Sequence, residues 1–284
     1  MKLVLGTASL GMNYGLFSYK KINRGEFKKI EKLVLESKIK LIDTASSYGH
    51  SEKIIGNSKL KKLNIITKIK LPRNNNIHVD NWVKKKLMNS LRKLRIKRIY
   101  GVMVHDYKDL MGKRGKEFLL SLQEFKKNKI INKIGISVYH PKEIKKILKF
   151  WIPNLVQIPL NPLDNRILDS GLMNILKKFR IKIYARSIFL QGLLVNDHSS
   201  FKIGKNYKLL LDKFKSWCSA NNVTNLESCI HFVKQFKKID YMVVGFNSYA
   251  HLKEIIDVFK KKQINIPKNF STNKLNLIDP RRWN

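Results

Sequence analysis

Short apolar runs alternate along this chain with amphipathic stretches of helical length. Eight runs have the length and composition of strands: Lys2–Gly6, Lys40–Asp43, Asn64–Thr67, Ile99–Val104, Lys133–Ile136, Leu155–Ile158, Lys182–Ala185 and Tyr241–Val244. The helices expected among them include Glu26–Ser37, Val79–Leu94, Lys116–Asn128, Pro141–Phe150, Asp169–Phe179, Lys208–Ala220, Asn225–Phe236 and Ala250–Lys260. Repeated strand–helix units form parallel sheets. The pattern therefore predicts an α/β protein folded as a (β/α)8 TIM barrel.

Four chemically useful side chains stand at or just past the ends of three successive predicted strands. Asp43 ends the second strand and Tyr48 follows it in LIDTASSYGHSEKIIG, Lys68 follows the third and His105 follows the fourth. In a parallel β/α barrel the C-terminal ends of the strands meet at one face, where the loops build the active site. We therefore expect an acid, a phenol, an amine and an imidazole to lie together.

This group suits the delivery of a proton to a carbonyl oxygen. A phenol near pKa 10 is a poor acid at neutral pH unless a nearby cation stabilises its phenolate. Lys68 is the expected cation, Asp43 would hold its ammonium group, and His105 would orient the substrate oxygen. A positioned acid typically contributes about 10²- to 10⁴-fold in rate, so a hydride donor must supply the rest. Each residue alone fits an ordinary cap or rim position, and only their order along the units favours catalysis.

The chain resembles the aldo-keto reductase family from LGTASLGMNYG near its start to VVGFNSYAHLKEI near its end. Its segment DTASSYGHSEKIIG is close to the family signature DTAxxYGxSExxIG. The resemblance implies that Asp43, Tyr48, Lys68 and His105 are the catalytic residues, with Tyr48 as the general acid. It also implies NAD(P)H-dependent reduction of a small carbonyl substrate, which would be an aldehyde, a ketone or a keto-sugar.

The later strands should hold the cofactor. By resemblance, Ser137 and Gln157 bind the nicotinamide carboxamide, whereas Val138 replaces an asparagine that usually assists them. Arg186 stands where relatives often carry an aromatic residue that stacks on the nicotinamide, and a guanidinium plane can also stack on a ring. In YARSIFLQGLL the residues expected along the pyrophosphate are Ser187, Phe189 and Gly192.

The turn GFNSYAHLKE after the eighth strand leads into a helix N-terminus, where N–H groups and the helix dipole favour anions. The residues expected to hold the adenosine end there are Gly245, Asn247, Ser248, His251 and Glu254. Gly245 and His251 stand where relatives often have a lysine and an arginine for the 2′-phosphate. We expect NADP as the cofactor, with NAD as the open alternative.

The resemblance also bears on the two ends of the chain. Family members often begin with a β-hairpin that plugs the barrel, but here Lys2–Gly6 is already the first strand, so we expect no plug. We expect one domain over residues 1–284, with a polar tail at 265–284. The tail would either lend a residue to the pocket or remain loosely attached.

The aromatic residues expected in the pocket wall are Tyr14, Phe17, Tyr107, Tyr139 and Phe189.

Composition narrows the function further. Lys and Arg outnumber Asp and Glu by 58 to 20, a net charge of +38 that would attract anions. The lysines are spread over every predicted helix, so we expect solvated surfaces and no specific nucleic-acid binding. No apolar run reaches the length of a membrane span, and Cys218 and Cys229 form no metal or disulfide pattern. We expect a cytoplasmic protein without a metal, as a monomer or weak oligomer.

Two alternatives remain open at this level. The same residues would serve an NAD(P)-dependent sugar or alcohol dehydrogenase working in the opposite direction. A cofactor-binding, redox-sensing regulatory subunit would keep the barrel and the cofactor without depending on turnover. The YARSIFLQGLL and DPRRW segments resemble those of bacterial members associated with surface sugars, which favours a sugar or nucleotide-sugar substrate.

Overall fold

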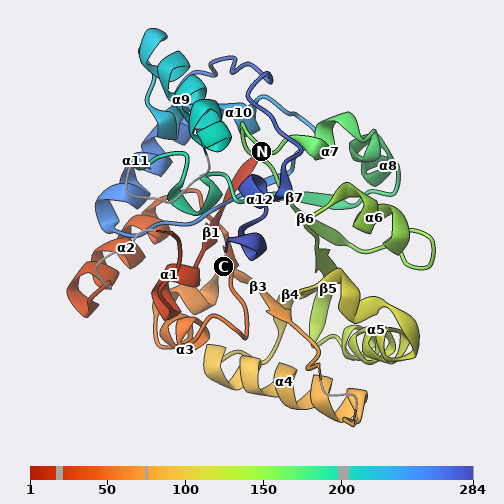
Figure 1. The fold of residues 1–284 in the computed structure, drawn as a ribbon. Coiled ribbons are helices and arrows are strands. Elements are labelled where there is room, and N and C mark those ends of the chain that lie inside the picture. The colour runs from red at the N-terminus through yellow and green to blue at the C-terminus, as the bar shows by residue number, and fades with distance from the viewer. Residues whose placement is uncertain (17–21, 74–75, 198–204, 284) are drawn as a thin grey trace.

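A closed barrel of parallel strands forms the centre of the molecule. The computed structural model describes residues 1–16, 22–73, 76–197 and 205–283. Its eight strands pair in chain order, and β8 closes the barrel against β1. They are β1 (Lys2–Gly6), β2 (Leu41–Asp43), β3 (Asn64–Ile69), β4 (Ile99–Val104), β5 (Ile131–Ser137), β6 (Leu155–Pro159), β7 (Lys182–Arg186) and β8 (Tyr241–Val244). Helices surround the strands (Figure 1), and the predicted TIM barrel is confirmed.

The predicted helices are present, with ends that differ from the predicted bounds by up to four residues. They are α2 (Arg24–Glu36), α4 (Val79–Leu94), α5 (Gly112–Lys127), α6 (Pro141–Ile147), α8 (Leu172–Lys178), α9 (Lys205–Ala220), α10 (Asn225–Lys234) and α11 (Tyr249–Lys260). Pro141 stands in the first turn of α6, where a missing N–H costs nothing, and His140 and Glu143 form a capping box there.

Short elements were not predicted. They are the helices α1 (Ala8–Gly11), α3 (Ser51–Gly56), α7 (Arg166–Asp169) and α12 (Leu275–Ile278), and the 3₁₀ turns η1 (Lys59–Lys62), η2 (Tyr107–Leu110), η3 (Leu190–Gly192) and η4 (Pro280–Arg282). The single helix predicted over Asp169–Phe179 is wrong at its start. Gly171 adopts φ +70° and ends α7 before α8 begins, a conformation that favours glycine.

Alternating side chains along the strands fill two separate layers. Inside the barrel, the buried side chains of one cluster are Val4, Leu41, Ile66, Met103, Leu155, Tyr184 and Val243. Their neighbours, such as Leu3 and Leu5, face outward and belong to the larger cluster packed against the helices. This alternation is the pattern of barrel strands buried on both faces. The interior layer closes the barrel centre and leaves the C-terminal end free for a site.

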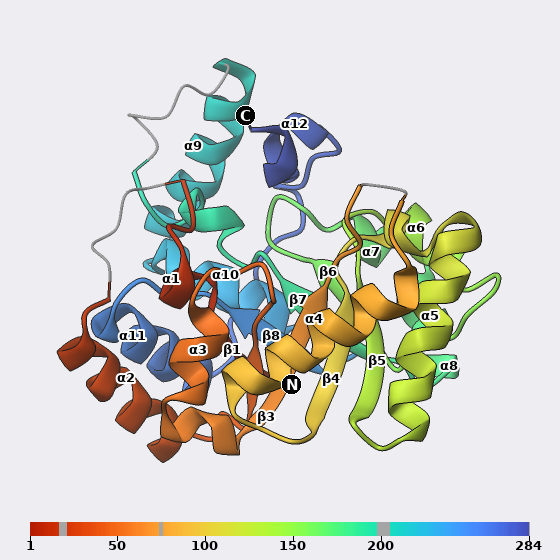
Figure 2. The same cartoon turned by 90° about the horizontal axis from the view of Figure 1, so that it is seen from below.

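The C-terminal tail is packed onto the barrel rather than loosely attached. Phe270, Leu277 and Ile278 are buried, and the N–H of Thr272 donates to the carbonyl of Leu163 at 2.9 Å. Figure 2 shows α12 at the end of the barrel away from the N-terminus. The tail therefore covers part of the face at which the strands end.

The sequence between Ser187 and Tyr207 predicts a polar loop, and the structure of the segment after β7 differs from this prediction. Its first half is apolar and buried, with Ile188, Leu190 and Leu194 almost inaccessible to solvent. Residues 198–204 of that prediction lie outside the described residues. No helix in the described part of the chain is long and apolar enough to cross a membrane.

Candidate active site

A buried ion pair lies at the C-terminal ends of β2 and β3. The ammonium Nζ of Lys68 lies 2.6 Å from Oδ2 of Asp43, and only 1% of the lysine is exposed. Nζ also donates to the carbonyl of Thr44 at 3.0 Å and lies 3.5 Å from the hydroxyl of Tyr48. Because water is excluded, Asp43 is the counter-ion that compensates the burial of this ammonium group.

Asp43 is also tied to the opposite side of the barrel. Its second carboxylate oxygen, Oδ1, accepts a hydrogen bond of 2.8 Å from Nε2 of Gln157 in β6. Lys68 and Gln157 thus share one carboxylate, which fixes the side chains of three strands with respect to each other. Within the described residues no hydrogen bond reaches the side-chain oxygen of Gln157, so this oxygen is available to a ligand.

The loop that carries Tyr48 is held by a close backbone approach. The N–H of His50 donates to the carbonyl of Gly11 in α1 at 3.3 Å, and the N–H of Ser51 donates to the carbonyl of Tyr48 at 2.9 Å. A Cβ atom at Gly11 would lie 1.9 Å from the Tyr48 carbonyl oxygen. Gly49 adopts φ +52° and would also clash with Gly11 if it carried a side chain. Two glycines therefore let these loops meet and place Tyr48.

His105 lies beside Tyr48. The two rings are edge to face with centroids 6.1 Å apart, and Nδ1 of His105 lies 3.5 Å from the Ser47 hydroxyl. Burial lowers the pKa of His105 to about 3, and the nearby cations Lys68, Arg186 and Lys70 act in the same direction. The imidazole is therefore neutral at physiological pH and carries one N–H that can donate a hydrogen bond.

The phenol of Tyr48 keeps its proton at neutral pH. Burial raises its pKa above the ordinary value, the negative charge of Asp43 raises it further, and the cation of Arg186 opposes both. Lys68 lies over the same ring, with Nζ 5.0 Å from the centroid. The group is thus a protonated acid with cations ready to stabilise its anion.

A cavity of about 850 Å³ opens beside this group. The predicted site residues that line it are Asp43, Tyr48, Gln157, Arg186, Ser187, Phe189, Gly192, Gly245, Asn247 and His251. Lys68 and Ser137 are buried, and Ser137 pairs with Gln157 in the sheet register. Ser248 does not line this cavity, and Glu254 lines a neighbouring hollow together with Asn247 and His251.

Several residues that line the cavity were not predicted from the sequence. They come from the ends of β1 and β8 and from the β7 loop: Gly6, Thr7, Ala8, Ser9, Gly15, Ile188, Gln191, Val195, Val243 and Phe246. The position of LGTASLG at the end of the first strand was the available signal, because every strand end of a barrel borders the same face. The N–H of Leu16 donates to the carbonyl of Gln191 at 3.2 Å, which joins the first loop to the seventh.

Only some of the aromatic residues predicted for the pocket wall line the cavity. Tyr14 and Phe189 line the cavity, and Tyr107 packs against the core from η2. Tyr139 lies under two guanidinium groups, with its ring centroid 4.0 Å from Cζ of Arg186 and 3.6 Å from Cζ of Arg281 in the tail. Phe17 lies outside the described residues. One face of Arg186 is thus already occupied, and a nicotinamide stacked on it would have to use the other.

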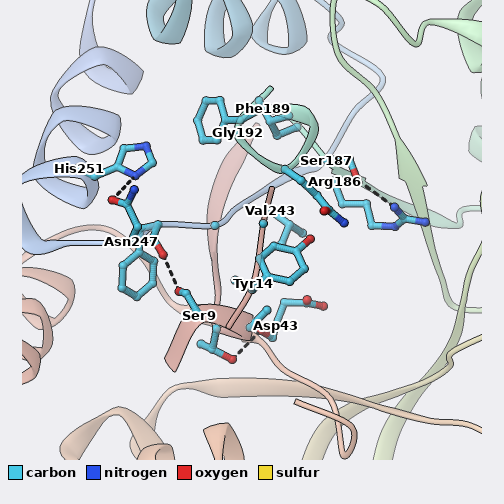
Figure 3. Close-up of a pocket in the computed structure, with 18 of the residues that line it drawn as sticks. Ser9, Tyr14, Asp43, Arg186, Ser187, Phe189, Gly192, Val243, Asn247 and His251 are labelled. Atoms are coloured by element: carbon cyan, nitrogen blue, oxygen red, sulfur yellow. Dashed lines mark hydrogen bonds between the residues drawn. The ribbon is translucent and has the colours of Figure 1, made fainter. Parts of the chain in front are cut away.

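The turn after β8 leads into the N-terminus of α11, which Ser248 caps. Oγ of Ser248 accepts from the N–H of His251 at 3.1 Å and caps α11, while His251 Nδ1 lies 2.9 Å from Oδ1 of Asn247. Burial lowers the pKa of His251, so its imidazole is neutral. Asn247 and His251 lie on one side of the cavity and Arg186 on the other (Figure 3). The cavity thus extends from the end of β7 to the N-terminus of α11.

The part of the chain that the structure describes contains no group of three or more His, Cys, Asp or Glu side chains that could hold a metal ion. Cys218 and Cys229 are buried free thiols.

This chain is similar to a known family and to solved structures. The model of the Aldo/keto reductase family matches residues 2–270. The aldo-keto reductase AKR11C1 from Bacillus halodurans, in its holo form, is 18% identical over 93% of this chain and 88% of that chain, with a TM-score of 0.72. The glycerol dehydrogenase AKR11B4 from Gluconobacter oxydans is 18% identical over 98% of this chain and 92% of that chain, also with a TM-score of 0.72. No curated protein matches.

Proposed function

Because the chain belongs to the aldo/keto reductase family, whose members are NAD(P)-dependent oxidoreductases, we propose that it reduces an aldehyde, ketone or keto-sugar with Tyr48 as the general acid. The observation that carries this proposal is the Tyr48 hydroxyl, 3.5 Å from the buried Lys68 ammonium, at the edge of a cavity. A bound reduced nicotinamide would supply the hydride to the carbonyl carbon. The protein must supply the proton and the geometry.

Proton transfer falls to Tyr48. As the carbonyl carbon gains the hydride, its oxygen becomes an alkoxide that takes the proton from the phenol and leaves an alcohol and a phenolate. The phenolate lies next to Lys68, whose positive charge favours it. His105, as a neutral donor beside Tyr48, would bind the same carbonyl oxygen and orient it. A neutral imidazole does not compete with Tyr48 for the role of acid.

The cofactor would lie across the cavity. Gln157 and Ser137, adjacent in the sheet, would hold the carboxamide; Gln157 would offer the oxygen that Asp43 does not use. The β7 loop, with Ser187, Phe189 and Gly192, would follow the pyrophosphate. Asn247, Ser248, His251 and the N-terminus of α11 would meet the adenosine end, with Gly245 at the turn and Glu254 in the adjoining hollow.

We favour NADPH over NADH, with a small margin. The positive net charge favours the cofactor with the additional phosphate. However, the described residues lining the hollow at the adenosine end include no lysine or arginine, and His251 is neutral. We therefore expect dissociation constants for NADPH and NADH that differ by less than about tenfold, roughly 1.4 kcal/mol.

The decisive experiment replaces Tyr48 by phenylalanine. Purified protein would be titrated with NADPH, and oxidation of NADPH would be followed with a panel of aldehydes, ketones and keto-sugars. Tyr48→Phe should keep the NADPH affinity and lose turnover by about 10²- to 10⁴-fold, because only the proton donor is removed. Tyr100→Phe, which removes a hydroxyl near the start of β4 at the opposite end of the barrel, is the matched control. Turnover that survives in Tyr48→Phe would refute the assignment of the acid.

Alcohol oxidation is the same reaction in reverse, with the phenolate of Tyr48 as the base. The geometry serves both directions, since the same atoms exchange the proton. Rates measured with carbonyl and NADPH, and with the corresponding alcohol and NADP⁺, decide which direction dominates.

A further inference from the structure

Arg186 is a cation that lines the cavity of the candidate site. Two other arginines lie near it, and each is neutralised by an aspartate two residues away. Nε of Arg166 lies 2.7 Å from Oδ1 of Asp164, and Nη2 of Arg281 lies 2.6 Å from Oδ2 of Asp279. Through the described ranges of the chain, no carboxylate forms an ion pair with Arg186.

Neutral contacts hold the Arg186 guanidinium in one orientation. Nη1 donates to the hydroxyl of Ser187 at 2.9 Å, and Nη2 donates to the carbonyl of Val138 at 3.0 Å. Its plane rests on the ring of Tyr139, which Arg281 covers from the tail. A guanidinium has five N–H donors, and these two bonds leave three of them. A fixed guanidinium with free N–H groups is suited to a carboxylate or a phosphate.

The positive charge also acts on the reaction centre. The charges of Asp43 and Lys68 offset each other in their ion pair, and His105 is neutral. Arg186 also interacts with the carboxylate of Asp164, but Arg166 already pairs with that carboxylate, so the two arginines share one negative charge and an excess of positive charge remains. The charge of Arg186 opposes the rise in the pKa of Tyr48 and contributes to the low pKa of His105. Arg186 and Tyr48 line the same cavity, so an anion bound to Arg186 inside it could belong to the reacting molecule.

The position of Arg186 separates it from the expected phosphates of the cofactor. Figure 3 shows Arg186 on the side of the cavity opposite Asn247 and His251, where α11 begins. Its guanidinium points toward Val138 and Tyr139, after β5, rather than toward the turn after β8. The anion that Arg186 would bind is thus distinct from the adenosine phosphates.

We propose that Arg186 binds a carboxylate or phosphate group of the substrate, so that the enzyme prefers anionic carbonyl compounds over neutral ones. This inference rests on the proposed function and specifies its substrate class. Arg186 would be a binding residue that sets specificity, while Tyr48 remains the acid for every carbonyl.

Two matched pairs of substrates test the inference. Succinic semialdehyde and its methyl ester differ in a carboxylate, and glyceraldehyde 3-phosphate and glyceraldehyde differ in a phosphate. For each pair, kcat/KM with NADPH is measured in the wild type, in Arg186→Met and in Arg98→Met. Arg98 is exposed at the other end of the barrel, and its replacement changes the net charge equally. The ratio of the two kcat/KM values within a pair cancels any effect of the substitution on cofactor binding or on Tyr48, because both substrates of the pair depend equally on the cofactor and on Tyr48.

We expect the wild type to prefer the anionic member of at least one pair by tenfold or more. Arg186→Met should lower that ratio by about 10- to 100-fold, the value of charge-assisted hydrogen bonds, and Arg98→Met should leave it unchanged. The pair that responds identifies the carboxylate or the phosphate as the ligand. An equal response of the ratio in Arg98→Met would mean that only the overall field attracts the anion, and would overturn the proposal.

Other outcomes are equally decisive. Wild type that turns over neutral carbonyls without preferring either anion would refute the anionic substrate class and leave the proposed function intact. Failure to bind NADPH or to reduce any carbonyl would refute the proposed function itself. A second measurement does not need a variant: with a neutral aldehyde as substrate, butyrate should inhibit the wild type competitively and butyramide should not. Equal inhibition by both would contradict a role for Arg186.

Discussion

Replacing Lys68 by methionine should destabilise the protein strongly. The substitution keeps the length of the side chain but leaves the carboxylate of Asp43, which is 4% exposed, without its counter-ion. Removal of one partner from a buried ion pair costs about 3–5 kcal/mol, because the other charge stays away from water. The hydrogen bond from Gln157 remains, so we expect the lower end of this range. At about 2 °C per kcal/mol for a chain of this size, the melting temperature should decrease by about 6 °C.

A double mutant separates the unpaired charge from the loss of packing. Asp43→Asn removes the carboxylate charge, so Lys68→Met with Asp43→Asn should recover at least about half of the lost free energy of unfolding. Both proteins should be inactive, since the cation beside Tyr48 is absent. Urea unfolding and thermal melts of the wild type, the two single variants and the double variant give the coupling energy.

The control is a pair of opposite charges at the surface. Lys253 lies 3.0 Å from Asp257 on α11, and about half of each side chain is exposed. Lys253→Met should leave the melting temperature nearly unchanged, because water already solvates both ions. A Lys68→Met protein as stable as Lys253→Met, or a double variant less stable than Lys68→Met, would refute the reasoning from the buried charge.

Three further predictions concern backbone fit and pH. Gly11→Ala would place Cβ 1.9 Å from the Tyr48 carbonyl oxygen, so melting temperature and turnover should both decrease, whereas Gly25→Ala, with its nearest neighbour at 3.4 Å, should behave as wild type. The pKa of His105, lowered to about 3, predicts that kcat/KM for reduction stays flat from about pH 5 to about pH 8; a step near pH 6.5, the ordinary pKa of histidine, would contradict this. Burial raises the pKa of Asp109 from 3.8 to about 6, so the folded state holds this proton more tightly than the unfolded state. Stability should therefore decrease as the pH rises through this interval, and melts of Asp109→Asn against pH should lack that contribution.

The strands and the catalytic candidates could be predicted because their signals are local. β4 and β8 have the predicted bounds, since apolar runs flanked by polar residues define a buried strand. β3 is longer than predicted and continues to Ile69. Barrel closure pairs Lys68 with Met103 and Ile69 with Val104, and this register is not visible in the segment itself. The roles of the four catalytic candidates stay a prediction.

What the sequence could not provide depends on contacts between distant segments. Gln157 donates to Asp43 from 114 positions away, and Arg281 reaches Tyr139 from the tail. Gly11 and Gly49 meet only because α1 packs against the loop after β2. None of these pairs produces a periodic pattern in the sequence, because each contact depends on how two distant segments fit together once the barrel has closed. The buried half of the β7 loop was missed for the same reason, since its apolar residues resemble neither a strand nor a helix.

The hydrogen bond from Gln157 to Asp43 joins the expected nicotinamide position to the acid through a single carboxylate. A ligand that donates to the oxygen of Gln157 polarises its amide and strengthens the bond that its Nε2 makes to Asp43. Asp43 then interacts less with Lys68, whose ammonium becomes more available to Tyr48. With the proposed cofactor contact at Gln157, cofactor affinity and the protonation of Tyr48 would be linked, and thermodynamic reciprocity would require each to change the other by the same factor. The loaded enzyme would therefore carry a stronger acid than the free one, so that proton donation is favoured only when a hydride is present to accompany it.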